Sequence, residues 1–266
     1  MAARSALINV MVSAATKAAR GLLRDFGEVE NLQVAAKGTS DFVSNADHKA
    51  EKTLRQELHK ARPKFGFLLE EQGTVEGEDD RHVWVVDPLD GTTNFLHGIP
   101  HFAISAALLR DGEPIAGIVH EPVRDEMFIA EKGAGAWLND RRLRVSGRRH
   151  LENAVVATGI PHRGRGDHEH FLKELPLVMA NTAGVRRFGS AALDLAWVAA
   201  GRYEGFWERH LNAWDVAAGI LLVREAGGLV TEMDGGANML ESGSILAAND
   251  QLHGPLRKLF KQAARA

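Results

Sequence analysis

Apolar residues near the start of the chain recur every three or four positions, which is the spacing of one face of an α-helix. The positions that follow this spacing are Leu7, Met11, Ala14, Ala18, Leu22 and Phe26. They predict an amphipathic helix over about residues 4–26. A second pattern predicts a helix that begins near Asn45, because Asn is a favoured N-cap residue. The apolar face of this second helix consists of Ala46, Ala50, Leu54 and Leu58.

Short apolar runs then replace the helical spacing and predict strands. Residues 67–69 form one such run, and residues 83–86 form an uninterrupted β-prone run that is typical of a strand buried on both faces. The polar residues 74–82 between them predict a loop. From residue 102 to residue 158, short apolar runs separated by turn residues predict an antiparallel meander.

The second half of the chain alternates between strand and helix patterns. Strands are predicted over residues 185–188, 203–207 and 245–248, and helices from Ser190 to Gly201, over 213–226 and over 251–264. The alternation predicts a mixed α/β (α+β) fold. No repeat or linker divides the chain, so we expect one domain over 1–266, with an α+β half of about 1–150 and an α/β half of about 151–266.

Composition narrows the function classes. The chain has 266 residues, with 32 Lys and Arg against 35 Asp and Glu, so its formal net charge is −3. This balance argues against a dedicated nucleic-acid binder, whose domain is usually basic. The chain has 0 Cys, which excludes a disulfide framework, thiolate metal sites and a cysteine nucleophile. Any bound metal must therefore use oxygen or imidazole ligands.

Membrane and secretion signals are not recognised. No stretch approaches the ~20 apolar residues that a spanning helix needs. Residues 6–15 are apolar, but Asn9 and Ser13 interrupt them and the helical spacing continues through Lys17. This favours a buried helix face over a signal peptide. We expect a cytoplasmic protein with no membrane partner.

Acidic residues follow two neighbouring strands. Glu70 and Glu71 come after the first, and Asp87 and Asp90 come after the second, in the segment Asp-Pro-Leu-Asp-Gly-Thr-Thr. Side chains at such positions project into the crevice where open sheets bind ligands. Two carboxylates with the Leu89 carbonyl between them, and Glu70 as a third carboxylate, are hard oxygen ligands that suit Mg²⁺.

Converging carboxylates repel one another unless cations neutralise them. Two or three divalent ions would do so, and would create a site for phosphoryl transfer. A simpler interpretation exists for each acid, however. Asp, Pro and Gly are also typical of plain turns. Asp215 and Asp47 stand in the first turns of predicted helices, where Asp also stabilises the helix dipole.

Four segments together resemble the inositol monophosphatase family in order and separation. They are Asp41-Phe42-Val43-Ser44-Asn45-Ala46-Asp47, Glu70-Glu71, Trp84 to Phe95 (WVVDPLDGTTNF), and Trp214-Asp215-Val216-Ala217-Ala218-Gly219 with Glu225-Ala226-Gly227-Gly228. A further segment, Arg187 to Asp194 (RFGSAALD), resembles the bacterial SuhB-type branch of that family. Two departures, Ser44 where Thr is common and Gln72 where Ser is common, remove no ligand. With four segments in register, a chance turn no longer explains the pattern.

The resemblance implies a layered αβαβα sandwich, usually dimeric, that hydrolyses inositol monophosphate with Mg²⁺ and is inhibited by Li⁺. It implies two or three Mg²⁺ ions and a metal-activated water that attacks directly. The implied metal ligands are Glu70, Asp87, Asp90, Asp215 and the carbonyl of Leu89. The implied catalytic residues are Thr92, Asp47 and Glu70, with Asp47 accepting the Thr92 hydroxyl proton and Glu70 acting through metal-bound water.

The resemblance also implies a substrate-binding set. Its members are Asp90, Gly91, Thr92, Gly189, Ser190, Ala191 and Glu208. The backbone N–H groups of Gly91 and Thr92 are expected to hold phosphate oxygens, as a helix N-terminus does. Glu208 is expected to accept hydrogen bonds from ring hydroxyls. The stretch 189–191 is expected to line the sugar side, although an ordinary helix N-cap explains it equally well.

Two alternatives to inositol monophosphate hydrolysis stay open. The same chemistry could serve another small ester: a 3′-phosphonucleotide, fructose bisphosphate or histidinol phosphate. The chain could instead bind a transcription complex or RNA through its arginine strip, Arg141 to Arg149 (RRLRVSGRR), with secondary or vestigial phosphatase activity. A solvated edge strand, which charge protects from aggregation, also explains the strip.

Overall fold

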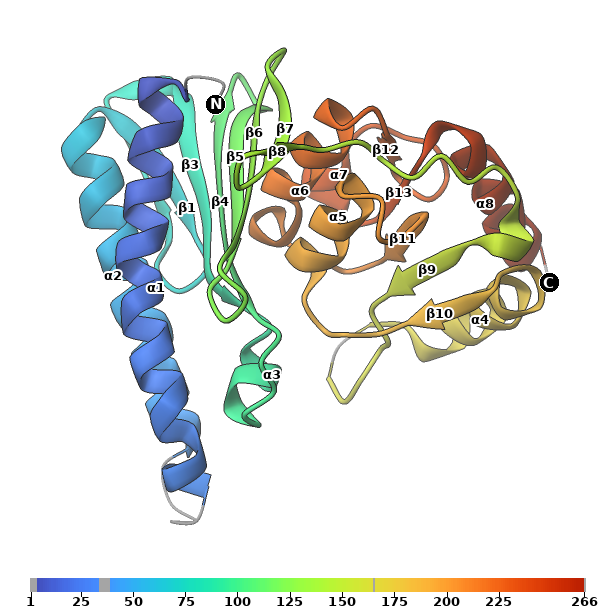
Figure 1. Cartoon of the computed structure of the whole chain (residues 1–266), viewed down its shortest axis with the longest axis horizontal. Helices are drawn as coiled ribbons and strands as arrows, with labels where there is room; N and C mark the ends of the chain where they lie inside the picture. Colours follow the sequence, from blue (N-terminus) through green and yellow to red (C-terminus); the bar gives the residue numbers. More distant parts are fainter. Residues whose placement is uncertain (1–3, 34–38, 165, 266) are drawn as a thin grey trace.

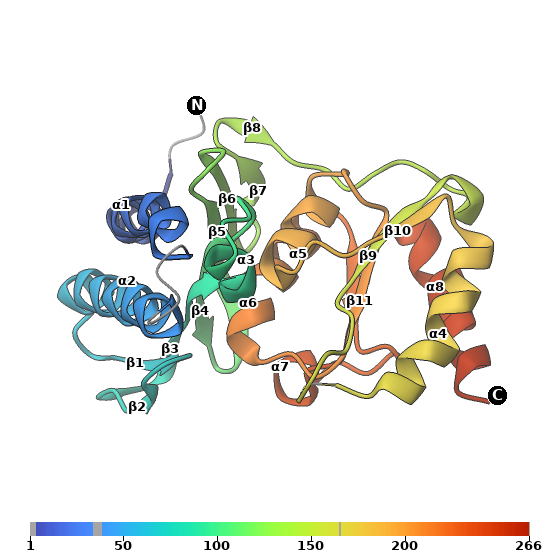
Figure 2. The same ribbon diagram turned by 90° about the horizontal axis from the view of Figure 1, so that it is seen from below.

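The computed structural model describes residues 4–33, 39–164 and 166–265. Helices and sheets alternate in five layers (Figures 1 and 2). The first is an outer pair, α1 (Ala6–Gln33) and α2 (Thr39–Ala61), and it covers an eight-stranded sheet. A central pair, α5 (Ala191–Ala199) and α6 (Ala213–Glu225), separates this sheet from a five-stranded one. A second outer pair, α4 (His168–Asn181) and α8 (Asp250–Ala263), covers the far face. The predicted αβαβα sandwich is confirmed.

The first sheet has the order β2-β1-β3-β4-β5-β6-β7-β8. Its strands are β1 (Phe65–Leu69), β2 (Gly73–Val75), β3 (Asp79–Asp90), β4 (Ala103–Arg110), β5 (Glu113–Glu121), β6 (Glu126–Glu131), β7 (Gly135–Leu138) and β8 (Arg141–Arg142). β1 and β3 run parallel, and every other neighbouring pair is antiparallel. The predicted meander is therefore confirmed from β4 to β8. The parallel pair matters for the site because both of its strands end at the same edge of the sheet.

The second sheet has the order β10-β9-β11-β13-β12. Its strands are β9 (Val155–Thr158), β10 (Gly184–Arg186), β11 (Gly205–Glu208), β12 (Leu229–Thr231) and β13 (Ile245–Ala248). β9 is parallel to β10 and β11, whereas β13 is antiparallel to β11 and β12. The short elements are α3 (Thr92–Leu96), the 3₁₀ turn Leu151–Asn153 and α7 (Met239–Ser242).

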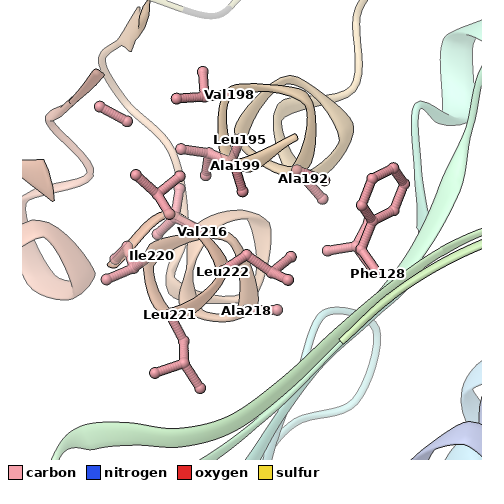
Figure 3. Packing of buried hydrophobic residues seen from close by; sticks show 14 of the residues in the cluster. Phe128, Ala192, Leu195, Val198, Ala199, Val216, Ala218, Ile220, Leu221 and Leu222 are labelled. Carbon is pink, nitrogen blue, oxygen red and sulfur yellow. The ribbon is translucent and has the colours of Figure 1, made fainter. Parts of the chain in front are cut away.

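Helix α6 is buried on all sides because it lies between the two sheets. Its residues from Asp215 to Val223 are all buried, as expected of a helix that is apolar around its whole circumference. Small residues allow the close approach: a Cβ on Gly219 would lie 2.5 Å from a methyl carbon of Leu195 on α5. Figure 3 shows side chains of α5 and α6 packed together, with Phe128 of the first sheet facing them.

Several predicted boundaries were wrong. α1 continues to Gln33, because the buried Val29 extends its apolar spacing. α2 begins at Thr39, so Asn45 lies inside the helix and is not its N-cap, since no Gly or Pro interrupts residues 39–61. The side chains of residues 30–44, which include most of the segment 41–47, lie outside the described residues.

Other segments also differ from prediction. Residues 74–82 were predicted as a loop, but they contain the end of β2 and the start of β3, where Asp79 pairs with β1 and His82 with β4. Residues 155–158 belong to the second sheet and not to the meander. No element was predicted for α4, β12 or α7. None of the helices within the described ranges has both the length and the apolar character needed to cross a membrane.

Candidate active site

The ends of β1 and β3 bring the first two acids together. Leu69 pairs with Val86 in the parallel register, and the backbone N–H of Glu70 donates to the Val86 carbonyl at 3.2 Å. Glu70 and Asp87 therefore leave adjacent strands at the same level, and their carboxyl groups lie close enough for the charge of Glu70 to add to burial in raising the pKa of Asp87.

The sequence predicted a strand over residues 83–86 that ends before Asp87, which was wrong. β3 continues to Asp90, with a break in the pairing register with β4 between Asp87 and Asp90. Inside this bulge, Asp87 Oδ1 accepts a hydrogen bond from the Leu89 N–H at 2.9 Å. Gly91 follows with a φ of 95°, in the left-handed region that favours glycine. The bulge turns the chain sharply while it keeps Asp87 and Asp90 close to each other.

Asp90 joins the two halves of the molecule. Its Oδ2 accepts hydrogen bonds from the Ser190 hydroxyl at 2.6 Å and from the Ala192 N–H at 2.7 Å. Ser190 is also the N-cap of α5, since its hydroxyl accepts from the Leu193 N–H. Ser190 was predicted both as a helix cap and as a site residue, and it has both roles because the N-terminus of α5 faces Asp90.

Asp215 lies in the first turn of α6 and is buried. Its Oδ2 accepts from the Asn212 N–H at 2.7 Å in a capping box, so the helix-capping interpretation holds for this residue. The Ser105 hydroxyl donates to the Trp214 carbonyl at 3.1 Å, and Ser105 pairs with Asp87 across β3 and β4. This contact ties the start of α6 to the acidic bulge.

Thr92 and Asp47 are not hydrogen-bonded in this conformation. The Thr92 hydroxyl donates instead to the Leu89 carbonyl at 3.0 Å. Asp47 is 6% exposed, and its Oδ1 has no hydrogen-bond partner among the residues that the structure describes. Asp47 still belongs to the acidic group, because Glu70 is the nearby charge that affects it most.

The acids raise one another's pKa. Burial, and then the charge of Glu70, raises the pKa of Asp47 to about 8. Burial also raises the pKa of Glu70 to about 6, and burial followed by the charge of Asp215 raises that of Asp90 to about 7. The pKa of Asp87 is well above its usual range because of burial and then Glu70. With all five acids ionised (the four above and Asp215), the group is electrostatically unfavourable.

The donor set fits a divalent cation. Within the described ranges, no three His, Asp or Glu residues already form a metal cage. However, the neighbouring carboxyl groups of Glu70 and Asp87 repel each other when both are ionised, and Asp47 Oδ1 has no partner among the described residues. A cation would neutralise the first pair and could bind the free oxygen. Every donor is a hard oxygen, which suits Mg²⁺ or a similar ion.

A cavity opens beside the acids. Six residues predicted for the site line it: Asp90, Gly189, Ser190, Ala191, Glu208 and Asp215. Glu208 ends β11 and lies directly over Gly159, where a Cβ would lie 2.0 Å from Glu208 Oε1. The remaining predicted residues (Asp47, Glu70, Asp87, Leu89, Gly91 and Thr92) do not line this cavity. Glu70 and Asp87 lie next to Asp90 and Asp215, which do line it.

Among the cavity residues that sequence reasoning missed, two bear on its function. Asp194 lines its wall and is 2% exposed, and Gly159 leaves the space that Glu208 occupies. Asp194 had a detectable signal, because it is an acidic residue within the otherwise apolar segment 191–199. Gly159 had none, since its role depends on a strand distant in sequence.

No residue of the arginine strip lines this cavity, and the strip begins at the edge of the first sheet. Arg141 and Arg142 form β8, the last strand in the sheet order, which fits the edge-strand interpretation. Arg142 lies over the Trp137 ring at 5.8 Å. Arg148 is bound to the buried Glu204 at 2.8 Å. Arg141, Arg144 and Arg149 are exposed.

Comparison with known proteins identifies the family. Residues 3–265 match the model of the inositol monophosphatase family. The chain belongs to this family. Its membership confirms the expectation of an enzyme of the phosphatase class. The acidic bulge and the cavity therefore belong to a protein of a phosphatase family, and a proposed function must account for both.

Individual relatives agree over nearly the whole chain. The inositol-1-monophosphatase of Mesorhizobium japonicum is 61% identical over 264 residues, covering 99% of both chains. The Nus factor SuhB of Pseudomonas aeruginosa is 46% identical over 247 residues, covering 91% of both. A crystal structure of the extragenic suppressor protein suhB from Bartonella henselae has a TM-score of 0.91 at 57% identity, covering 97% of this chain and 99% of that one.

Proposed function

We propose that the protein is a Mg²⁺-dependent phosphomonoesterase that hydrolyses inositol monophosphate to inositol and phosphate. The observation that carries this proposal is the convergence of Glu70, Asp87, Asp90 and Asp215 beside a cavity whose wall contains Glu208. Cation ligands and a hydroxyl-binding carboxylate next to each other are what a polyol phosphate requires. The name of the M. japonicum relative supports the same substrate.

Two or three Mg²⁺ ions would be held by Glu70, Asp87, Asp90, Asp215 and the Leu89 carbonyl. Bound there, the ions would acidify water and neutralise the charge of the phosphate. Asp47 and Thr92 would hold the attacking water, with the Thr92 hydroxyl turning from the Leu89 carbonyl to donate to Asp47. Cations bound to the neighbouring acids would lower the pKa of Asp47, so that its carboxylate could accept the Thr92 hydroxyl proton.

The chain's remaining groups would bind the two ends of the ester. The N–H groups of Gly91 and Thr92 would hold phosphate oxygens. The segment 189–191 and Glu208 would contact the inositol side, with Glu208 accepting from ring hydroxyls. The water oxygen bonds to phosphorus as the bond from phosphorus to the inositol oxygen breaks. The proton lost by the attacking water would pass to the pair of Thr92 and Asp47, and the inositol oxygen would take up a proton from solvent.

Phosphate release from a panel of esters tests the proposal. The panel contains inositol 1-phosphate, 3′-phosphoadenosine 5′-phosphate, fructose 1,6-bisphosphate and histidinol phosphate, each with Mg²⁺ and with or without Li⁺. Preferred turnover of the inositol ester, lost in Asp87→Asn and suppressed by Li⁺, is expected. Asp125→Asn is the matched control, because the Asp125 side chain is 99% exposed. Preference for another ester would retain the chemistry and change the substrate.

A second candidate function is association with a transcription complex in the cytoplasm. It is favoured by the name of the P. aeruginosa relative, a Nus factor. Arg141, Arg142 and Arg144 would form the contact, since Arg148 is bound to Glu204. Changing these three residues to Glu should abolish RNA or protein binding and leave phosphate release intact. If the triple variant binds as the parent does, the strip is only a charged edge.

We also propose a homodimer. Apolar side chains are exposed near the cavity at Ile99, Val123 and Phe188, which are 48%, 39% and 41% exposed. Phe188 contacts both His101 and Trp197, and Arg124, next to Val123, lies over the same Trp197 ring. These residues therefore surround one point on the surface. Exposed apolar side chains that gather in this way are typical of a protein–protein interface.

A further inference from the structure

Asp194 is a buried acid without a visible structural task. It lies in α5, is 2% exposed and lines the cavity. Its Oδ1 has no hydrogen-bond partner, and no hydrogen bond to either carboxyl oxygen is found within the described part of the chain. A buried carboxyl group without a partner destabilises a folded protein. A ligand that supplies the missing partner would explain why the group is there.

The surroundings of Asp194 are mostly acidic. Glu208 and Asp90 are the neighbouring charges that act on it most strongly, and Arg187 is the opposing one. Burial and these two acids raise the pKa of Asp194 well above its usual range, which favours its neutral form. A neutral carboxyl group donates one hydrogen bond and accepts others, whereas the ionised form only accepts.

Asp194 and Glu208 reach the cavity from different elements. Asp194 belongs to α5 and Glu208 to β11, and both line the cavity that Asp90 and Asp215 border on the side of the acidic bulge. An ester whose phosphate is held at the bulge would extend its alcohol group towards these two side chains. Alcohol groups that carry several hydroxyls can both donate to and accept from such a pair.

We propose that Asp194 is a specificity-determining residue that binds, together with Glu208, the hydroxyl groups of a polyhydroxylated leaving alcohol. This deepens the proposed phosphatase function and rests on it. Asp194 contacts the alcohol and leaves the phosphate end to other residues. It therefore selects polyol esters over esters of alcohols that lack hydroxyls, and it affects substrate binding more than turnover.

The experiment compares two esters with opposite demands. Inositol 1-phosphate has a polyol leaving group, and 4-nitrophenyl phosphate has a leaving group without further hydroxyls. Asp194→Ala should lower kcat/KM for inositol 1-phosphate about tenfold or more, mainly through KM, and should change that for 4-nitrophenyl phosphate by less than about twofold. Asp194→Asn, which keeps a donor and an acceptor, should retain most of the polyol activity.

Control variants separate specificity from folding. Asp125→Asn changes an acid that is 99% exposed and does not line the cavity, so the ratio of the two activities should not change in this variant. Equal losses of Asp194→Ala on both esters would show a structural role and overturn the inference. Equal activity of Asp194→Ala and parent on inositol 1-phosphate would overturn it too.

Binding of free myo-inositol, measured by calorimetry, covers the case in which no ester is hydrolysed. That case refutes the proposed function. Weaker binding of myo-inositol by Asp194→Ala, by about tenfold, would still support the inference about Asp194. Unchanged binding, or no binding by the parent protein, would reject the inference as well. Asp194→Asn should bind myo-inositol nearly as the parent does, and thermal melting of every variant checks its folding.

Discussion

Ser190 donates a hydrogen bond of 2.6 Å to the carboxylate of Asp90, a residue one hundred positions earlier in the chain. Asp90 ends β3 in the first sheet, and Ser190 caps the helix that separates the two sheets. The acid is therefore fixed by the helix N-terminus, and the helix begins at the acid. Stability and the geometry of the proposed metal site depend on the same contact.

Ser190→Ala should lower the stability of the fold and weaken the proposed metal site. The Leu193 N–H loses its cap, which costs about 1 kcal/mol, and Asp90 keeps only its bond from Ala192. A chain of this length should then melt roughly 2–4 °C lower. The Mg²⁺ concentration for half-maximal phosphatase activity should rise. Ser190→Thr, which retains the hydroxyl, is the control. An unchanged melting temperature and Mg²⁺ dependence in the alanine variant would contradict this account.

The acidic group makes the metal-free protein less stable as the pH rises. The pKa of Asp47 is raised from 3.8 to about 8 and that of Asp90 from 3.8 to about 7. Between these limits the folded chain holds protons that the unfolded chain releases, so the free energy of unfolding falls with increasing pH. His101 acts in the opposite direction, but burial, and then Arg124, lowers its pKa to about 4. Above a pH of about 6.5, His101 is neutral in both the folded and the unfolded chain, so it does not affect how stability changes with pH there.

Thermal melting in EDTA between about pH 6.5 and 8.5 checks this sign. The melting temperature should fall with pH, and added Mg²⁺ should raise it more at the upper end, where more carboxylates are ionised. Asp47→Asn should flatten the fall in EDTA, whereas Asp125→Asn should not. A melting temperature that rises with pH in EDTA would refute the electrostatic description.

Local patterns predicted the elements well where their ends carry a signal. Residues 245–248 were predicted as a strand and form β13, and Asn249 immediately caps α8 by accepting from the Leu252 N–H. The predicted start of α2 was wrong. Asn45 has a side chain that favours helix caps, but no Gly or Pro near it ends the helix, which begins earlier at Thr39. Propensity is a weak guide when no breaker is present.

The site was predictable in part. Glu70 and Asp87 follow adjacent strands, so their proximity could be expected from the strand pattern. The order of the five layers was expected from the family resemblance and not from the periodicities. The contacts of Asp90 with Ser190, and the proximity of Asp194 to Glu208, depend on how the second sheet docks. No local pattern encodes that docking.

Gly159→Ala should displace Glu208. Gly159 does not have a positive φ, so its backbone accepts alanine, but the new Cβ would lie 2.0 Å from Glu208 Oε1. The carboxylate must move, and kcat/KM for inositol 1-phosphate should fall about tenfold. Adding Glu208→Ala to Gly159→Ala should lower kcat/KM little further, because both changes remove the same interaction of Glu208. Gly147→Ala, at an open position, is the control. Fully additive losses would show that Gly159 acts independently of Glu208.

Phe188→Glu should separate the proposed dimer. Phe188 is 41% exposed beside Ile99 and Val123, and a charge there would be buried without a partner in an apolar interface. Light scattering after size exclusion should give twice the chain mass for the parent and the single-chain mass for the variant. Met179→Glu is the matched control, because Met179 is 60% exposed on α4 at the opposite side of the layers. A monomeric parent would refute the dimer, and a dimeric Phe188→Glu would move the interface to another face.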